Sequence, residues 1–193
     1  MKKVVCFGLI LAVILAGCSK PADTGAKSPS EGTFGASYGA FQSAFEAKNY
    51  GQALTELRSL MRTFWAESPL VLGNIRFVAG PDNSYGIYEP RKNDVFAAGE
   101  PIYLYMEPSG HAMIKNPAGY YEFGFKADFQ VTDESGKVLG DQTDFAAMPF
   151  KSWNFNTEIS LTFTYTLSGL EQGKYKIVTQ VSDAHCSREA TAA

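Results

Sequence analysis

The amino-acid sequence predicts a mainly β protein, in which an antiparallel β-sandwich over residues 69–193 follows a helical hairpin over residues 36–68. Two observations lead to this fold class. Apolar residues recur at helical spacing as far as Trp65, and at every second position in the strands that follow Leu70. No helical pattern separates these later strands, so they are expected to pair with one another in antiparallel sheets.

The first residues have the layout of a secretory signal peptide, predicted over residues 1–17. Lys2 and Lys3 are followed by the apolar run Val4–Leu15, which is shorter than the roughly 20 residues of a membrane span. The run closes on "LAGC", which resembles the lipobox of bacterial lipoproteins. The resemblance implies attachment of diacylglycerol to Cys18, cleavage before it and acylation of the new amino terminus. The alternative is a secreted protein with a chance cysteine at the cleavage point.

A lipid on Cys18 places the protein outside the cytoplasm, anchored to the cell membrane, because several acyl chains hold a protein far more firmly than one. Ser19 follows the cysteine where lipoproteins of the inner membrane tend to carry aspartate, which favours the outer membrane in a diderm cell. Residues 18–35 are rich in Ser, Pro, Gly and Lys and are predicted to form a flexible tether.

Composition excludes several classes of function. The chain has 17 basic and 20 acidic residues and no basic cluster, so nucleic acid is not an expected partner. After loss of Cys6 with the signal and lipidation of Cys18, only Cys186 keeps a thiol, so neither an internal disulfide nor a cysteine metal site is expected. Cys186 is either a reactive thiol or a chance unpaired residue.

The helical hairpin is predicted from two apolar stripes. Tyr38, Phe41 and Phe45 form the first, and the second follows a break at residues 48–51 and ends before Ser68. The second stripe contains Leu54, Leu57, Leu60, Met61, Phe64 and Trp65. The stretch "AFEAKNYGQALTEL" faintly resembles half of a tetratricopeptide repeat. A solenoid needs about three such units, and the sequence contains no second copy, so an isolated hairpin is the interpretation.

Strands are predicted where apolar and polar residues alternate, since one face of an antiparallel sheet is buried and the other is wet. The clearest are "YEFGFKADFQV" and "EISLTFTYTL". Others are predicted at residues 71–79, 85–89, 102–107, 138–139 and 175–182. The stretch "LSGLEQGKYKIVTQVSD" resembles the corner of immunoglobulin-like and fibronectin-III-like sandwiches. That resemblance implies that Leu170 packs inward and that the Tyr175 hydroxyl bonds back to the corner backbone.

The sequence offers few candidate catalytic residues, and no cofactor or metal is expected. His185 lies next to Cys186, but adjacent residues on a strand point to opposite faces, which argues against a catalytic pair. His111 is expected in an exposed loop, where it could ligate a metal together with Glu107. The chain contains no phosphate loop, nucleophile elbow or HExxH motif, so an enzyme is not expected.

Aromatic residues are the remaining candidates for binding. Tyr103 and Tyr105 share one face of the predicted strand "PIYLYME", which is either covered by the helical hairpin or open as a platform near Tyr120. Trp153 lies in the aromatic stretch "MPFKSWNFN", predicted to be a loop.

Three hypotheses follow. The first is a non-catalytic envelope lipoprotein that docks a protein partner or helps to assemble a complex. The second is a glycan-binding lipoprotein that uses the exposed aromatic residues. The third is a metal-dependent hydrolase around His111.

Overall fold

The computed structural model describes residues 4–7 and 30–193, with side chains from residue 34 onward. The chain divides into two units, of which one contains the helices within residues 18–68 and the other contains the described strands. The predicted cleavage site, the lipid on Cys18 and most of the predicted tether lie outside the described residues.

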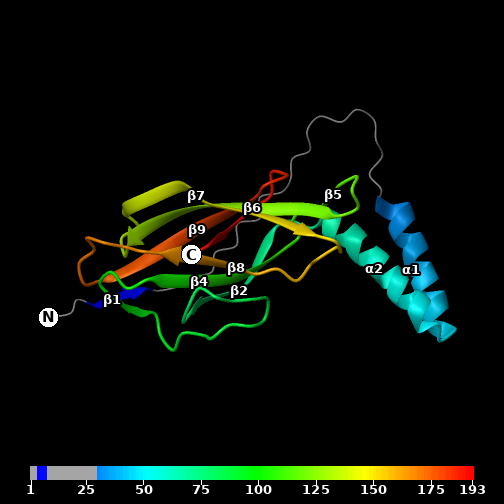
Figure 1. Ribbon diagram of the computed structural model, residues 1–193, viewed down its shortest axis with the longest axis horizontal. Helices are drawn as coiled ribbons and strands as arrows, with labels where there is room; N and C mark the ends of the chain where they lie inside the picture. Colours follow the sequence, from blue (N-terminus) through cyan, green and yellow to red (C-terminus); the bar gives the residue numbers. More distant parts are fainter. Residues whose placement is uncertain (1–3, 8–29) are drawn as a thin grey trace. The chain divides into compact units, whose positions relative to one another are not determined.

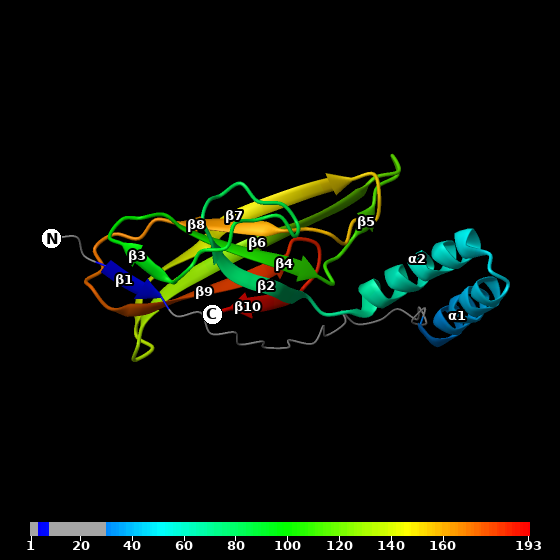
Figure 2. The ribbon, with the colours of Figure 1, turned by 90° about the horizontal axis from the view of Figure 1, so that it is seen from below.

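The helical unit is a pair of antiparallel helices, α1 (Ser30–Glu46) and α2 (Tyr50–Glu67) (Figure 2). The Asn49 side chain caps α2 by accepting a hydrogen bond of 3.3 Å from the Gln52 backbone N–H. Helix α1 begins within the segment predicted to be tether, so the boundary at residue 36 was wrong. Phe34 continues the helical spacing of Tyr38 back by one turn, which extends the helix. Among the described helices, none has the length and apolar character needed to cross a membrane.

The β unit contains ten described strands in two sheets. They are β1 (Val4–Phe7), β2 (Val71–Val78), β3 (Val95–Ala97), β4 (Ile102–Ser109), β5 (Ile114–Lys115), β6 (Tyr121–Asp133), β7 (Val138–Ser152), β8 (Leu161–Tyr165), β9 (Lys174–Asp183) and β10 (Glu189–Ala192). The larger sheet has the order β3-β1-β9-β6-β5, with β7 on β6 and β10 on β9, and the smaller has the order β2-β4-β8. Figure 1 shows the two sheets as facing layers.

All strand pairs are antiparallel except β1 with β9. Strand β1 runs beside β3 at one end of the larger sheet (Figure 2). It falls within the predicted signal peptide, so cleavage before Cys18 would leave the facing edges of β3 and β9 unpaired.

The core lies between the two sheets. The smaller sheet contributes Leu104 and Phe163, and the larger contributes Phe125 and Val181, all with at most 2% of their surface exposed. Alternation along each strand sends these residues inward and their neighbours outward. The predicted fold class, a mainly β antiparallel sandwich preceded by two helices, is confirmed.

The largest differences between the predicted and the observed strands concern residues 85–89 and β7. Residues 85–89 do not form a strand but belong to the long segment between β2 and β3, which we call the covering loop (residues 79–94). Strand β7 continues to Ser152 instead of ending near residue 139, so Phe150 lies in a strand and not in a loop. The short strands β3, β5 and β10 were not predicted, because two to four residues carry no readable period.

The corner before β9 has the predicted contact. The Tyr175 hydroxyl donates a hydrogen bond of 2.8 Å to the Glu171 backbone carbonyl, and Leu170 packs against the core.

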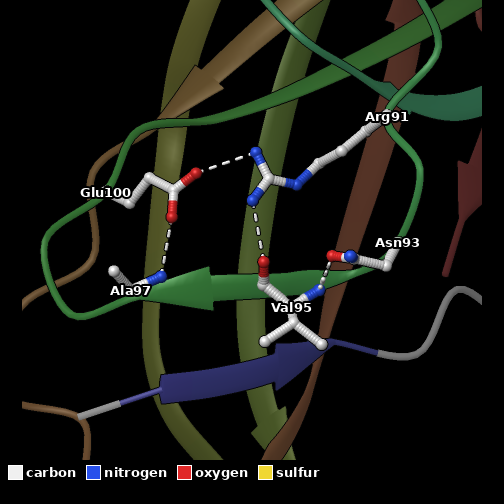
Figure 3. Close-up of polar contacts among 5 residues, drawn as sticks. All are labelled: Arg91, Asn93, Val95, Ala97 and Glu100. Carbon is white, nitrogen blue, oxygen red and sulfur yellow. Dashed lines mark hydrogen bonds and ion pairs between the residues drawn. The ribbon is translucent and has the colours of Figure 1, made fainter. Parts of the chain in front are cut away.

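The segment between β2 and β4 is held by Arg91. Its guanidinium lies 2.8 Å from the Glu100 carboxylate and donates a hydrogen bond of 2.7 Å to the Val95 carbonyl (Figure 3). The same guanidinium lies 4.1 Å from the centre of the Phe96 ring.

Candidate functional site

Tyr105, a predicted binding residue, is fully buried beneath the covering loop. Its hydroxyl donates to the Glu107 carboxylate at 2.7 Å and accepts from the Gly86 backbone N–H at 3.0 Å. Its ring centre lies 4.4 Å from that of Tyr88. A platform role for Tyr105 is therefore wrong, because no part of its ring reaches solvent.

The covering loop is fastened to the smaller sheet by polar contacts. Asn83 donates to the Thr162 hydroxyl on β8 at 3.2 Å. On β2, at the other edge of the smaller sheet, Asn74 donates to the Glu107 carboxylate at 2.8 Å and to the Tyr88 hydroxyl at 3.1 Å. The sequence left two alternatives for the face of Tyr103 and Tyr105, cover by the helical hairpin or an open platform. Cover by residues 79–94 was not predicted. Tyr103, two residues before Tyr105 on the same strand face, is half-buried.

The electrostatics of this network separate its two titratable groups. Burial is the largest cause that raises the pKa of Tyr105, to about 12, and the hydrogen bond to Glu107 adds to it. Burial also acts to raise the pKa of Glu107, but hydrogen bonds from Tyr105 and Asn74 outweigh it, and the pKa is lowered. The tyrosine therefore stays protonated and the carboxylate ionised near neutral pH, which suits a structural contact.

Glu107 and His111 are not brought together as metal ligands. His111 is fully buried, with its ring centre 5.1 Å from Phe123 and 5.2 Å from Phe125, whereas Glu107 faces the covering loop. The expectation of an exposed loop histidine was wrong, because the chain turns inward after Gly110, whose φ is 76°. Burial lowers the pKa of His111 to about 4. Within the described ranges, no three His, Cys, Asp or Glu residues are placed to hold a metal ion.

The other two predicted binding residues, Tyr120 and Trp153, do come together. Their ring centres lie 5.7 Å apart in an edge-to-face arrangement. The Lys151 ammonium group lies 3.5 Å from the centre of the Tyr120 ring and 5.8 Å from that of Trp153. Trp153 has 70% of its surface exposed. Tyr120 directly precedes β6 and Trp153 directly follows β7 of the larger sheet, whereas Tyr103 lies on β4 of the smaller sheet.

Strand register explains this meeting. Glu122 on β6 pairs with Ile114 on one side and with Lys151 on the other, so these three side chains share the outer face of the sheet. The alternate residues Phe123 and Phe150 stack in the core with ring centres 5.2 Å apart. Ile114, Tyr120, Glu122, Lys151 and Trp153 form what we call the sheet-end patch.

A polar groove, missed by the sequence interpretation, lies farther along β6. It has a volume of about 390 Å³ and its polar lining consists of Asp128, Gln130, Asp141, Gln142, Thr143, Gln180 and Thr191. Register pairs Gln130 with Asp141, and Asp128 with Gln180, which gathers carboxylates and amides from three strands. The sequence did not predict this groove, because β7 was predicted at residues 138–139 alone and the pairing of Asp141 and Gln142 with β6 needs the full strand.

Neither a protein-family model nor a curated protein matches this chain.

Proposed function

We propose that this chain is a lipid-anchored, non-catalytic envelope lipoprotein whose β unit docks a protein partner through the sheet-end patch. The observation that carries the docking role is Trp153, 70% exposed beside Tyr120 and Lys151 at the end of a paired sheet. The anchor rests on the "LAGC" motif at residues 15–18.

The composition of the patch suits protein recognition. Trp and Tyr are the residue types that most often dominate binding energy at interfaces, because each contributes a large rigid surface with a polar tip. Lys151 and Glu122 supply charges of both signs beside the aromatic rings, where they favour the correct orientation of a partner. Strand pairing on both sides of β6 holds these groups in place before binding, which lowers the entropic cost of docking.

The non-catalytic part of the proposal draws support from the titratable groups. General acid–base catalysis works best with a pKa near the working pH. Burial lowers the pKa of His111 to about 4, and burial raises that of Tyr105 to about 12. Both groups therefore hold one protonation state at neutral pH.

Glycan binding is a second candidate, favoured by the polar groove. Outward-facing residues of β6 lead from the sheet-end patch to the groove, where Asp128, Gln130 and Gln180 offer carboxylate and amide groups. An oligosaccharide on this face would stack a sugar ring on Trp153, and its hydroxyl groups would form hydrogen bonds in the groove.

We also propose that the sandwich is immunoglobulin-like. The support is the hydrogen bond from the Tyr175 hydroxyl to the Glu171 carbonyl at the corner before β9.

Capture from detergent-solubilised envelopes tests the docking role. We expect a stoichiometric partner with the wild type and with Tyr85→Ala, which removes an exposed aromatic side chain of the covering loop, but not with Trp153→Ala. The proposal fails if no stoichiometric partner is recovered, or if Trp153→Ala retains it fully.

Fluorescence tests the glycan alternative. The chain has 2 tryptophans, so Trp65→Phe leaves Trp153 as the sole reporter. A flat titration of this variant with cell-wall and capsule oligosaccharides would eliminate glycan binding. Mass spectrometry of the purified protein tests the anchor, since an unmodified Cys18 thiol would contradict it.

A further inference from the structure

Most of the large apolar side chains described in the helical hairpin are exposed. Among the side chains described from residue 34 onward, the buried ones in the hairpin are Ala44 on α1 and Ala53 and Leu60 on α2. The large apolar side chains with 41% to 66% of their surface exposed are Phe34, Tyr38, Phe45, Tyr50, Leu54, Leu57, Met61 and Phe64. Single exposed apolar residues are normal on protein surfaces, but a contiguous group of this size marks a contact surface.

These side chains lie on one side of the hairpin. On each helix they recur at the spacing i, i+3, i+4 and therefore form a stripe. Viewed along its own helix axis, each stripe is rotated in the same sense from the buried alanine, which is Ala44 on α1 and Ala53 on α2. Because the two helices are antiparallel, rotations in the same sense from their mutual contact bring both stripes to the same side of the hairpin. Phe45 connects the stripes, with its ring centre 5.9 Å from Phe41 and 6.0 Å from Tyr50.

The border of this apolar face along α2 is basic and aromatic. Arg58 and Arg62 are exposed and lie one turn apart on α2. Trp65 follows Met61 by four residues and therefore lies beside it at the same border. Arginine side chains at such a border can extend their charge towards lipid headgroups, and tryptophan is enriched at membrane–water interfaces.

We propose that this face of the hairpin lies in the interface of the lipid bilayer. The inference rests on the proposed lipid anchor. Helix α1 begins at Ser30, so 11 residues separate it from Cys18, and a chain of that length spans at most about 40 Å. The anchor thus holds the hairpin close to a bilayer surface, where an amphipathic helix buries its apolar face about 5–10 Å deep. The acyl chains and the hairpin then act as two membrane signals on one protein.

Quenching by brominated lipid tests the placement. The full-length lipoprotein, purified from membranes, is reconstituted into vesicles of phosphatidylcholine and phosphatidylglycerol that are brominated near the carbonyl end of their acyl chains. In Trp153→Phe, Trp65 is the sole tryptophan, and at an interfacial depth of about 5–10 Å its fluorescence should fall by about half. In Trp65→Phe, the remaining Trp153 reports the β unit and should keep its fluorescence.

Charge substitutions separate the apolar face from the rest of the hairpin. Leu57→Glu with Met61→Glu, made in the Trp153→Phe background, should abolish the quenching. Gln52→Glu with Thr55→Glu adds the same charge to exposed positions outside the stripe and should retain it. Circular dichroism should show the same helix content for both pairs, because all four positions are exposed.

The failures of the two proposals are distinguishable by flotation of the vesicles. Protein that floats but keeps full Trp65 fluorescence overturns the hairpin placement and leaves the anchor standing. Cross-linking between hairpins in that case identifies a second copy as the occupant. Protein that does not float and carries an unmodified Cys18 overturns the anchor and the placement with it.

Discussion

We expect acid to destabilise the folded protein through protonation of His111, because the fully buried ring of this residue is held neutral in the folded protein. Burial is the largest cause that lowers its pKa from 6.5 to about 4, although Asp183 acts in the opposite direction. The unfolded chain takes up a proton near pH 6.5 and the folded chain does so only near pH 4. Stability therefore falls as the pH drops through this window, and the difference of about 2.5 pKa units corresponds to about 3 kcal/mol.

The variant His111→Phe removes the titratable imidazole and keeps an aromatic ring against Phe123 and Phe125. Urea unfolding at a series of pH values between about 7 and 4 measures the effect as a difference between wild type and variant, in which the shared carboxylate titrations cancel. We expect the wild type to lose about 3 kcal/mol more than the variant over this range. Parallel pH profiles would refute the reasoning. NMR titration of the His111 ring checks the pKa in the wild type even if the variant folds poorly.

Three further predictions concern the β unit. Tyr105→Phe should lower the free energy of unfolding by about 1–3 kcal/mol in urea titrations, because it strips hydrogen bonds from buried groups, whereas Tyr103→Phe should cost less than half as much. Gly124→Val should destabilise by about 1–3 kcal/mol in thermal melts, since its Cβ would lie 3.1 Å from the Met148 carbonyl oxygen, and an unchanged melting temperature would contradict this contact. Arg91→Ala should make the segment between β2 and β4 the first site of limited proteolysis, and an unaltered cleavage pattern would show that the ion pair and the carbonyl contact in Figure 3 do not hold it.

Several features were determined by the sequence alone because they depend on neighbours within a few residues. Alternation predicted β6 and β9, and helical spacing predicted α2 with its end before Ser68. The contact of Tyr175 with the Glu171 carbonyl also spans only four residues, so a local motif was enough to predict it. The lipid anchor at Cys18 stays a prediction of this local kind.

The tertiary structure decided which aromatic residues are available for binding. The sequence treats Tyr105 and Trp153 alike, as aromatic residues near predicted strands, yet one is fully buried and the other is 70% exposed. The difference comes from the covering loop, which places Gly86 against a tyrosine 19 residues away, and from the pairing of β6 with β7, which places Tyr120 beside Trp153. Burial at these positions depends on contacts between segments distant in sequence, and local periodicity carries no information about such contacts.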